Sequence, residues 1–139
     1  MKTYVQKPAE VKRQWHLVDV KGRVLGQVAT EISQLLMGKN KPTFTPNVDG
    51  GDYVVVVNAK LVEVTGNKPA RKMYYQHSHL PGGISEATFV EMIEKKPGEV
   101  IERAVYNMLP KNKLRAERMA RLKVYADTEH KHHSQLGNK

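Results

Sequence analysis

The segment from Lys111 to Lys123 is a run of cationic side chains in which Glu117 is the only acid. Ammonium and guanidinium groups bind phosphate oxygens, so the run is typical of a polyanion-binding surface. At helical spacing Lys111, Arg115 and Arg118 would share a face, although Leu122 shares it too. The alternative is a solvated charged face without a partner. The cations of this segment are Lys111, Lys113, Arg115, Arg118, Arg121 and Lys123.

Two further basic loops strengthen the first interpretation. One contains Lys39 and Lys41, and the other contains Lys68, Arg71 and Lys72. The acids gather elsewhere, on two helices predicted for the middle of the chain: Glu86, Glu91, Glu94, Glu99 and Glu102. Such separation of charge indicates a binding surface for a polyanion.

Residues 72–83 combine aromatic, imidazole and glycine residues beside these cations. Tyr74, Tyr75, His77 and His79 have rings that stack on bases and groups that bond to ribose hydroxyls, which distinguish RNA from DNA. Gly82 and Gly83 lack a Cβ and would let a backbone approach phosphates. A strand with inward tyrosines, followed by a plain turn, explains the same residues equally well.

Motifs of enzymes and metal sites are weak by comparison. Gly22 to Gly26 is only GxxxG, and Gly38-Lys39-Asn40 lacks the other residues of a phosphate-binding P-loop. Asp49 and Asp52 flank glycines and are interpreted as turn residues. His130, His132 and His133 have no fourth ligand at a diagnostic spacing, so we expect no metal site, cofactor, catalytic residue or small-molecule substrate.

The composition sets the class of protein. The chain has 139 residues, a net charge of +9, a pI near 9.8 and no cysteine. Disulfides and thiolate metal sites are therefore excluded. The longest apolar run, Tyr53 to Val57, is far shorter than a membrane helix, and the N-terminus shows no secretory signal. We expect a cytoplasmic protein without a membrane partner.

Hydrophobic periodicity predicts the elements that position these residues. Trp15 to Val20 is expected to be a strand, and Leu25 to Leu36 forms a helical stripe that ends at a Gly38 cap. The continuous run YVVVV predicts a strand covered on both faces. Further predictions are short strands at Leu61–Thr65, Met73–His77 and Leu122–Tyr125, a helix capped by Thr88, and a helix that begins at Pro97 and ends before Pro110.

These elements predict an α/β fold with a small, mostly parallel central sheet. Residues 1–14 are expected to form a basic N-terminal arm, residues 15–126 a single α/β domain, and residues 127–139 a polar, irregular C-terminal tail.

From about Trp15 to Gln135 the sequence resembles the family of bacterial ribosomal large-subunit protein thirteen. Each matching string is short, but their number and common order are specific. The main strings are WHLVD (15–19), GKNKP (38–42), FTP (44–46), GDYVVVVNA (51–59), TGNK (65–68), YQHS (75–78), PGG (81–83), MLPKN (108–112) and LKVYA (122–126).

The resemblance implies a three-layer α/β/α domain that binds 23S ribosomal RNA beside neighbouring large-subunit ribosomal proteins and joins the subunit early. It adds Ser78 and Asn112 to the candidates. The expected RNA-binding residues are Lys39, Lys41, Lys68, Arg71, Lys72, Tyr75, His77, Ser78, Gly82, Gly83, Lys111, Asn112, Lys113, Arg115, Arg118, Arg121 and Lys123.

The sequence departs from the usual pattern of that family at several positions. We expect these departures to affect local loop geometry and individual contacts. The positions are Gln27, His79, Leu80, Tyr106, Asn107, Asp127 and Lys131.

The predicted function is that of a structural constituent of the large (50S) ribosomal subunit that binds 23S ribosomal RNA and supports early assembly. The alternative is a messenger-RNA-binding regulator of translation that acts off the ribosome, since some members of the family are linked to that role.

Overall fold

The computed structural model describes residues 1–137, and a three-stranded parallel sheet forms its centre. The strands, in sheet order, are β1 (Trp15–Asp19), β2 (Tyr53–Val57) and β5 (Leu122–Val124). The valine run therefore occupies the middle strand, where both faces are covered. The predicted mixed α/β fold with a small parallel sheet is confirmed.

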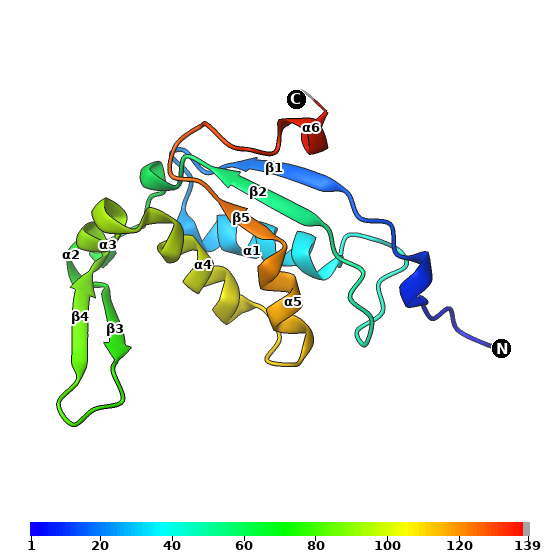
Figure 1. Ribbon diagram of the computed structural model, residues 1–139, viewed down its shortest axis with the longest axis horizontal. Helices are drawn as coiled ribbons and strands as arrows, with labels where there is room; N and C mark the ends of the chain where they lie inside the picture. The colour runs from blue at the N-terminus through cyan, green and yellow to red at the C-terminus, as the bar shows by residue number, and fades with distance from the viewer. Residues whose placement is uncertain (138–139) are drawn as a thin grey trace.

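Alternate residues of β2 face two different layers. Val54 and Val56 belong to the main core, together with side chains of α1 (Leu25–Met37) and α4 (Pro97–Met108). Val55 and Val57 instead pack against Leu136 of the short helix α6 (His133–Leu136). Figure 1 shows α1 and α4 below the sheet and α6 above it. The predicted tail is thus irregular only in part, because its buried leucine closes the upper face.

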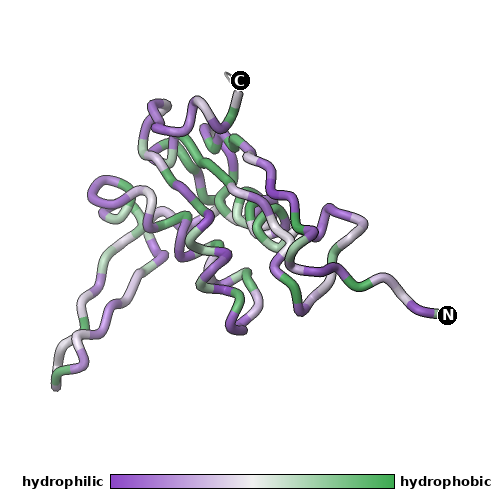
Figure 2. The backbone as a smooth tube through the Cα atoms, turned by 45° about the vertical axis from the view of Figure 1, so that its right-hand side comes forward, coloured by the Kyte–Doolittle hydropathy of each residue, from purple (hydrophilic) through white to green (hydrophobic). Residues whose placement is uncertain are grey.

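The apolar stripe of α1 is buried as the periodicity predicts: Leu25, Val28, Ala29, Ile32 and Leu36. Figure 2 shows hydrophobic residues concentrated along α1 and the central strands. The helix ends at Gly38, whose φ of +78° is left-handed. A Cβ at Gly38 would lie 2.8 Å from the carbonyl oxygen of Gly50, so both φ and space require glycine there.

A β-hairpin extends away from this body (Figure 1). It pairs β3 (Met73–His77) with β4 (Ile84–Thr88) in antiparallel register. The predicted strand at Met73–His77 is confirmed, but it lies outside the parallel sheet, and β4 was not predicted. The short helix α2 (Lys68–Arg71) precedes the hairpin.

The predicted cap at Thr88 is confirmed at the start of α3 (Phe89–Lys95). The Thr88 hydroxyl accepts a hydrogen bond from the Glu91 N–H at 3.3 Å, and the Thr88 N–H donates to the Glu91 carboxylate at 3.4 Å. This reciprocal pair satisfies two amides at the helix start. It thereby fixes the direction in which the chain leaves the hairpin.

The strand predicted at Leu61–Thr65 is wrong. The chain instead forms a 3₁₀ helix, η2 (Ala59–Leu61), and then a single bridge between Val24 and Glu63. The hydrogen bonds there run to the Lys21–Leu25 segment and not to a sheet edge: the Leu25 N–H donates to the Glu63 carbonyl and the Gly22 N–H to the Leu61 carbonyl. The segment therefore connects β2 to α2 without widening the sheet.

The N-terminal segment packs against the body as well as extending from it. It contains a 3₁₀ turn, η1 (Pro8–Glu10), and a buried Gln6 whose N–H donates to the Thr45 hydroxyl at 3.1 Å. The Arg13 guanidinium donates to the backbone carbonyls of Gly51 and Asp49. Among residues 1–137, no helix combines the length and apolar character needed to cross a membrane.

Candidate nucleic-acid interface

Helix α2 and the residue that follows it present three cations near the base of the hairpin. Lys68 and Arg71 are exposed, and Lys72 is half-buried with its ammonium 5.4 Å from the centre of the Tyr74 ring. Burial, and then the charge of Lys68, lower the pKa of Lys72. Within residues 1–137 no carboxylate lies within ion-pair distance of these three side chains. They are thus free to bind an external anion.

The hairpin carries aromatic and imidazole rings but neither lysine nor arginine. Tyr75, His77 and Ser78 are exposed, and residues 73–88 contain neither lysine nor arginine. A Cβ at Gly83 would lie 1.8 Å from the Ser78 hydroxyl oxygen and 3.0 Å from the Leu80 carbonyl oxygen, so a larger residue there would displace the Ser78 side chain. The hairpin can therefore stack on bases or bond to ribose, but its side chains cannot neutralise phosphates.

The loop between α4 and α5 (Leu114–Ala120) holds the next cations. Lys111 and Lys113 are exposed, and the Asn112 side-chain oxygen accepts a hydrogen bond from the Leu114 N–H at 3.1 Å. Asn112 therefore shapes the loop that presents the two lysines. Arg115 lies over the Tyr106 ring, 3.8 Å from its centre, and donates to the Tyr106 hydroxyl at 2.6 Å.

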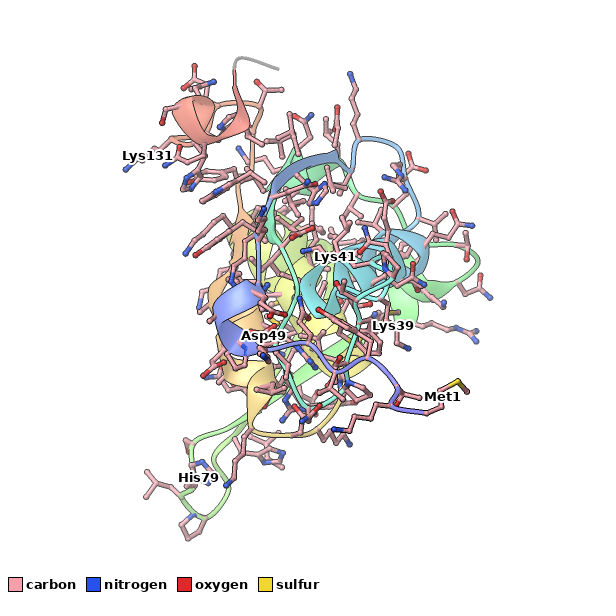
Figure 3. The ribbon with its side chains drawn as sticks, turned by 90° about the vertical axis from the view of Figure 1, so that its right-hand side faces the viewer. Met1, Lys39, Lys41, Asp49, His79 and Lys131 are labelled. Carbon is pink, nitrogen blue, oxygen red and sulfur yellow. The ribbon has the colours of Figure 1, made fainter. Side chains whose placement is uncertain are left out.

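Lys39 and Lys41, two residues apart, have different environments. Lys39 is exposed after α1, whereas the Lys41 ammonium donates to the Asp52 carboxylate at 2.6 Å and to the Lys12 and Gly50 carbonyls. Figure 3 labels both side chains. Lys41 is therefore engaged within the protein, and it ties the N-terminal segment to the loop before β2.

Asp52 is the centre of that contact and more than a turn residue. Its carboxylate, 1% exposed, also accepts from the Gln14 N–H at 3.1 Å and lies 2.8 Å from the His16 ring nitrogen. Burial raises the pKa of Asp52, but the hydrogen bonds from Lys41, Gln14 and His16 outweigh it and hold the pKa below its usual value.

Arg118 and Arg121, both expected from the sequence to bind RNA, are buried in the structure. Arg118 is 1% exposed and Arg121 6% exposed. The Arg121 guanidinium donates to the Asp52 carbonyl at 2.9 Å, to the Leu36 carbonyl at 3.0 Å, and to the Asp49 carboxylate. Asp49 also lies 3.7 Å from Arg118. These arginines hold α5 against the loop before β2, so the shared outward face of Lys111, Arg115 and Arg118 does not exist.

Lys123 is half-buried on β5. Its register partner is Val55, which faces the C-terminal segment, so Lys123 lies on the face of the sheet opposite α1 and α4. On that side, His130 and His133 stack at 4.1 Å and His132 lies 5.1 Å from the Trp15 ring. Across residues 1–137, no three His, Asp or Glu side chains are arranged to hold a metal ion.

The remaining candidates gather toward one end of the molecule. Figures 1 and 2 place the hairpin tip and the α4–α5 loop at the end away from α6, and His79 marks the hairpin tip in Figure 3. Lys68, Arg71 and Lys72 lie at the hairpin base, whereas Lys39 and Lys123 lie apart from them. The interface thus combines stacking groups on the hairpin with unpaired cations beside it.

Sequence reasoning missed the residues of α4 that border this interface. Glu99, Glu102, Arg103 and Tyr106 line a groove against β3. Their spacing of three or four residues places them on one helix face, which is the signal that could have identified them.

Comparison with known proteins identifies similar sequences over nearly the whole chain. The family model described as Ribosomal protein L13 matches residues 13–131. The chain is 54% identical to large ribosomal subunit protein uL13 of Clostridioides difficile, covering 97% of this chain and 94% of that protein. It is 50% identical to the uL13 protein of Chloroflexus aggregans, with 97% and 94% covered, and 54% identical to that of a Geobacter strain, with 97% and 95% covered.

Proposed function

The chain belongs to the ribosomal protein L13 family, and we propose that it binds 23S ribosomal RNA and supports early assembly of the large subunit. As a member of this family it is a structural constituent of the large ribosomal subunit and not an enzyme. It works in the cytoplasm, where bacterial ribosomes lie. Its partners there are ribosomal RNA and neighbouring ribosomal proteins.

The observation that carries the proposal is the division of cations into two groups. Arg118, Arg121 and Lys41 are engaged with Asp49 and Asp52 inside the protein. The second group has no carboxylate within ion-pair distance among residues 1–137: Lys39, Lys68, Arg71, Lys72, Lys111, Lys113, Arg115 and Lys123. Cations without an internal carboxylate, of which those at the hairpin base lie beside exposed stacking groups, match a polyanion that also carries bases.

Phosphate contacts supply affinity through the release of counterions, so binding should depend steeply on salt. With about six phosphates neutralised, affinity for a 23S transcript should fall on the order of 10³-fold between about 50 and about 200 mM salt, by the duplex-DNA coefficient. Filter binding of the full chain measures this slope, and a slope near zero would contradict the proposal.

Sedimentation separates the ribosomal role from regulation off the ribosome. A constituent of the large subunit should co-sediment with that subunit in cells that express the chain, and assembly intermediates should contain it early. Presence in messenger-RNA complexes alone would favour the translational regulator.

A further inference from the structure

A groove of about 630 Å³ lies between β3 and the outward face of α4. Its walls include Tyr74, Tyr106, Glu102 and Asn107. Lys72 lines this groove and also two adjoining hollows, one of which runs along Lys68 and Arg71 on α2. The groove is therefore continuous with the unpaired cations at the hairpin base.

Tyr106 gives the groove a surface for a flat aromatic group. The residue is 43% exposed although the Arg115 guanidinium lies over its ring. The guanidinium covers one face and its hydrogen bond to the hydroxyl fixes the ring orientation. Aromatic rings presented in this way, beside cations, stack on nucleic-acid bases.

The two carboxylates of the groove differ in their partners. Glu99 accepts two hydrogen bonds from Arg103, at 2.5 and 3.0 Å, and lies 3.8 Å from the Lys96 ammonium. Glu102 has no ion-pair partner among residues 1–137, and burial together with the charge of Glu99 raises its pKa. An unpaired carboxylate repels phosphate but accepts hydrogen bonds from the exocyclic amino group of a base.

We propose that this groove holds one unstacked base of the bound RNA, stacked on Tyr106 with an exocyclic amino group donating to Glu102. The proposal rests on the RNA-binding function proposed above. The sugar-phosphate backbone that leaves the groove passes along Lys68, Arg71 and Lys72, where no internal carboxylate competes. The base is cytosine, adenine or guanine, because each of these carries an exocyclic amino group and uracil has none. A peptide would fit the apolar part of the groove, but the row of unpaired cations at its rim favours RNA.

The stacking contact is tested by two substitutions at one position, measured as affinity of the full chain for a 23S transcript over a range of salt. Tyr106→Leu removes the aromatic face and should weaken binding on the order of 5- to 100-fold. Tyr106→Phe keeps the face and should bind within about threefold of the parent chain. Tyr106 itself contacts no phosphate, so the salt slope should change by less than about 1 in both variants, even though each loses the hydrogen bond from Arg115. Equal affinity of the Leu variant and the parent would overturn the proposal.

Glu102→Gln tests the proposed hydrogen bond, because the two interpretations of Glu102 predict opposite changes in RNA affinity. If Glu102 is only a negative charge near RNA, its removal should tighten binding. If its carboxylate accepts from a base, removal of the charge should weaken binding by about three- to tenfold, because bonds to charged groups are the stronger ones. Glu94→Gln, an exposed acid on α3, is the matched control and should not weaken binding. Unchanged or tighter binding of the Glu102 variant overturns the proposal.

The controls distinguish a failure of the groove proposal from a failure of the proposed RNA-binding function. A parent chain that shows no salt-dependent binding contradicts the proposed function itself. A parent chain that binds normally while Tyr106→Leu also binds normally contradicts the groove alone. Loss of incorporation into subunits without loss of affinity for naked RNA would assign the groove to a neighbouring protein, and that result too would overturn the proposal.

Discussion

Two regions of the molecule use the same residue types for opposite purposes. Around Asp49 and Asp52, cationic side chains are buried and bonded to carboxylates and backbone carbonyls. Along α2 and the α4–α5 loop, cationic side chains meet no carboxylate within residues 1–137. Both regions contain several lysines and arginines, so the presence of cations alone does not reveal which of them serve binding.

What separates the regions is the position of the acids. Asp49 and Asp52 come before β2, and the fold brings them against residues of α5 and of the loop after α1. Removing an interior acid should therefore lower the free energy of unfolding and leave the side chains of the interface unchanged. Removing a surface cation should weaken binding and leave the fold intact.

The largest effect is expected for Asp49→Ala. It leaves the guanidiniums of Arg118 and Arg121 buried beside each other without their carboxylate, at a cost of about 3–5 kcal/mol in the free energy of unfolding. Denaturant titration measures this loss. A change below about 1 kcal/mol would show that the interior cluster does not hold the fold together.

Asp52→Asn should cost about 2–3 kcal/mol at neutral pH, because hydrogen bonds to a charged group are lost. The pKa of Asp52 in the folded chain lies below its ordinary value of 3.8. Its carboxylate therefore stabilises the fold fully above that value, and the contribution disappears as the pH falls toward the lower, folded pKa.

Unfolding free energies measured between about pH 5 and about pH 2 should fall less steeply for the Asp52→Asn variant than for the parent. If the unfolding free energies of the two proteins fall equally with pH, Asp52 does not contribute to the loss of stability in acid.

Lys68→Ala combined with Arg71→Ala should lower the salt slope of RNA binding by about 2 and weaken affinity on the order of 50-fold at about 0.1 M salt. Stability should stay within about 0.5 kcal/mol of the parent, because both side chains are exposed. Lys21→Ala combined with Lys95→Ala, which removes two exposed lysines outside the proposed interface, is the matched control. Similar salt slopes for both double variants would mean that RNA binding does not depend on where the removed cations lie.

The smallest effect is expected for Asp127→Ala, which breaks an ion pair of 3.1 Å with Lys60. The side chains are 69% and 50% exposed, so water screens the pair and its loss should cost about 0–1 kcal/mol. Compared with Asp49→Ala in the same denaturation experiment, this variant shows what burial adds to an ion pair. Equal losses would erase the distinction between the two regions.

Local sequence pattern was sufficient for the elements whose signal lies in neighbouring residues. The stripe of α1, its Gly38 cap, the valine run of β2 and the Thr88–Glu91 box all form as predicted. Each depends on periodicity, on the φ of a single residue or on a bond across one helical turn.

The elements and partners that the sequence did not predict share a different cause, which is contact between residues far apart in the sequence. Arg121 bonds to the Leu36 carbonyl, 85 positions away, so nothing near it in sequence indicates burial. Strand β4 is recognised as a strand only through its pairing with β3. The helix in the tail forms where Leu136 packs against Val55 and Val57 on the upper face of the sheet. For the candidate site, the α2 and α4–α5 cations stay predictions, whereas Lys41, Arg118 and Arg121 required the fold to reveal their partners.

The order of strands in the central sheet has a consequence for synthesis. The middle strand, β2, pairs on one side with a strand near the N-terminus and on the other with β5, which ends at Val124. A nascent chain cannot complete its core until nearly all of it has left the exit tunnel, and contacts so distant in sequence form slowly. A chain that stops before β5 would expose one edge of β2, which is the kind of unpaired edge that aggregates.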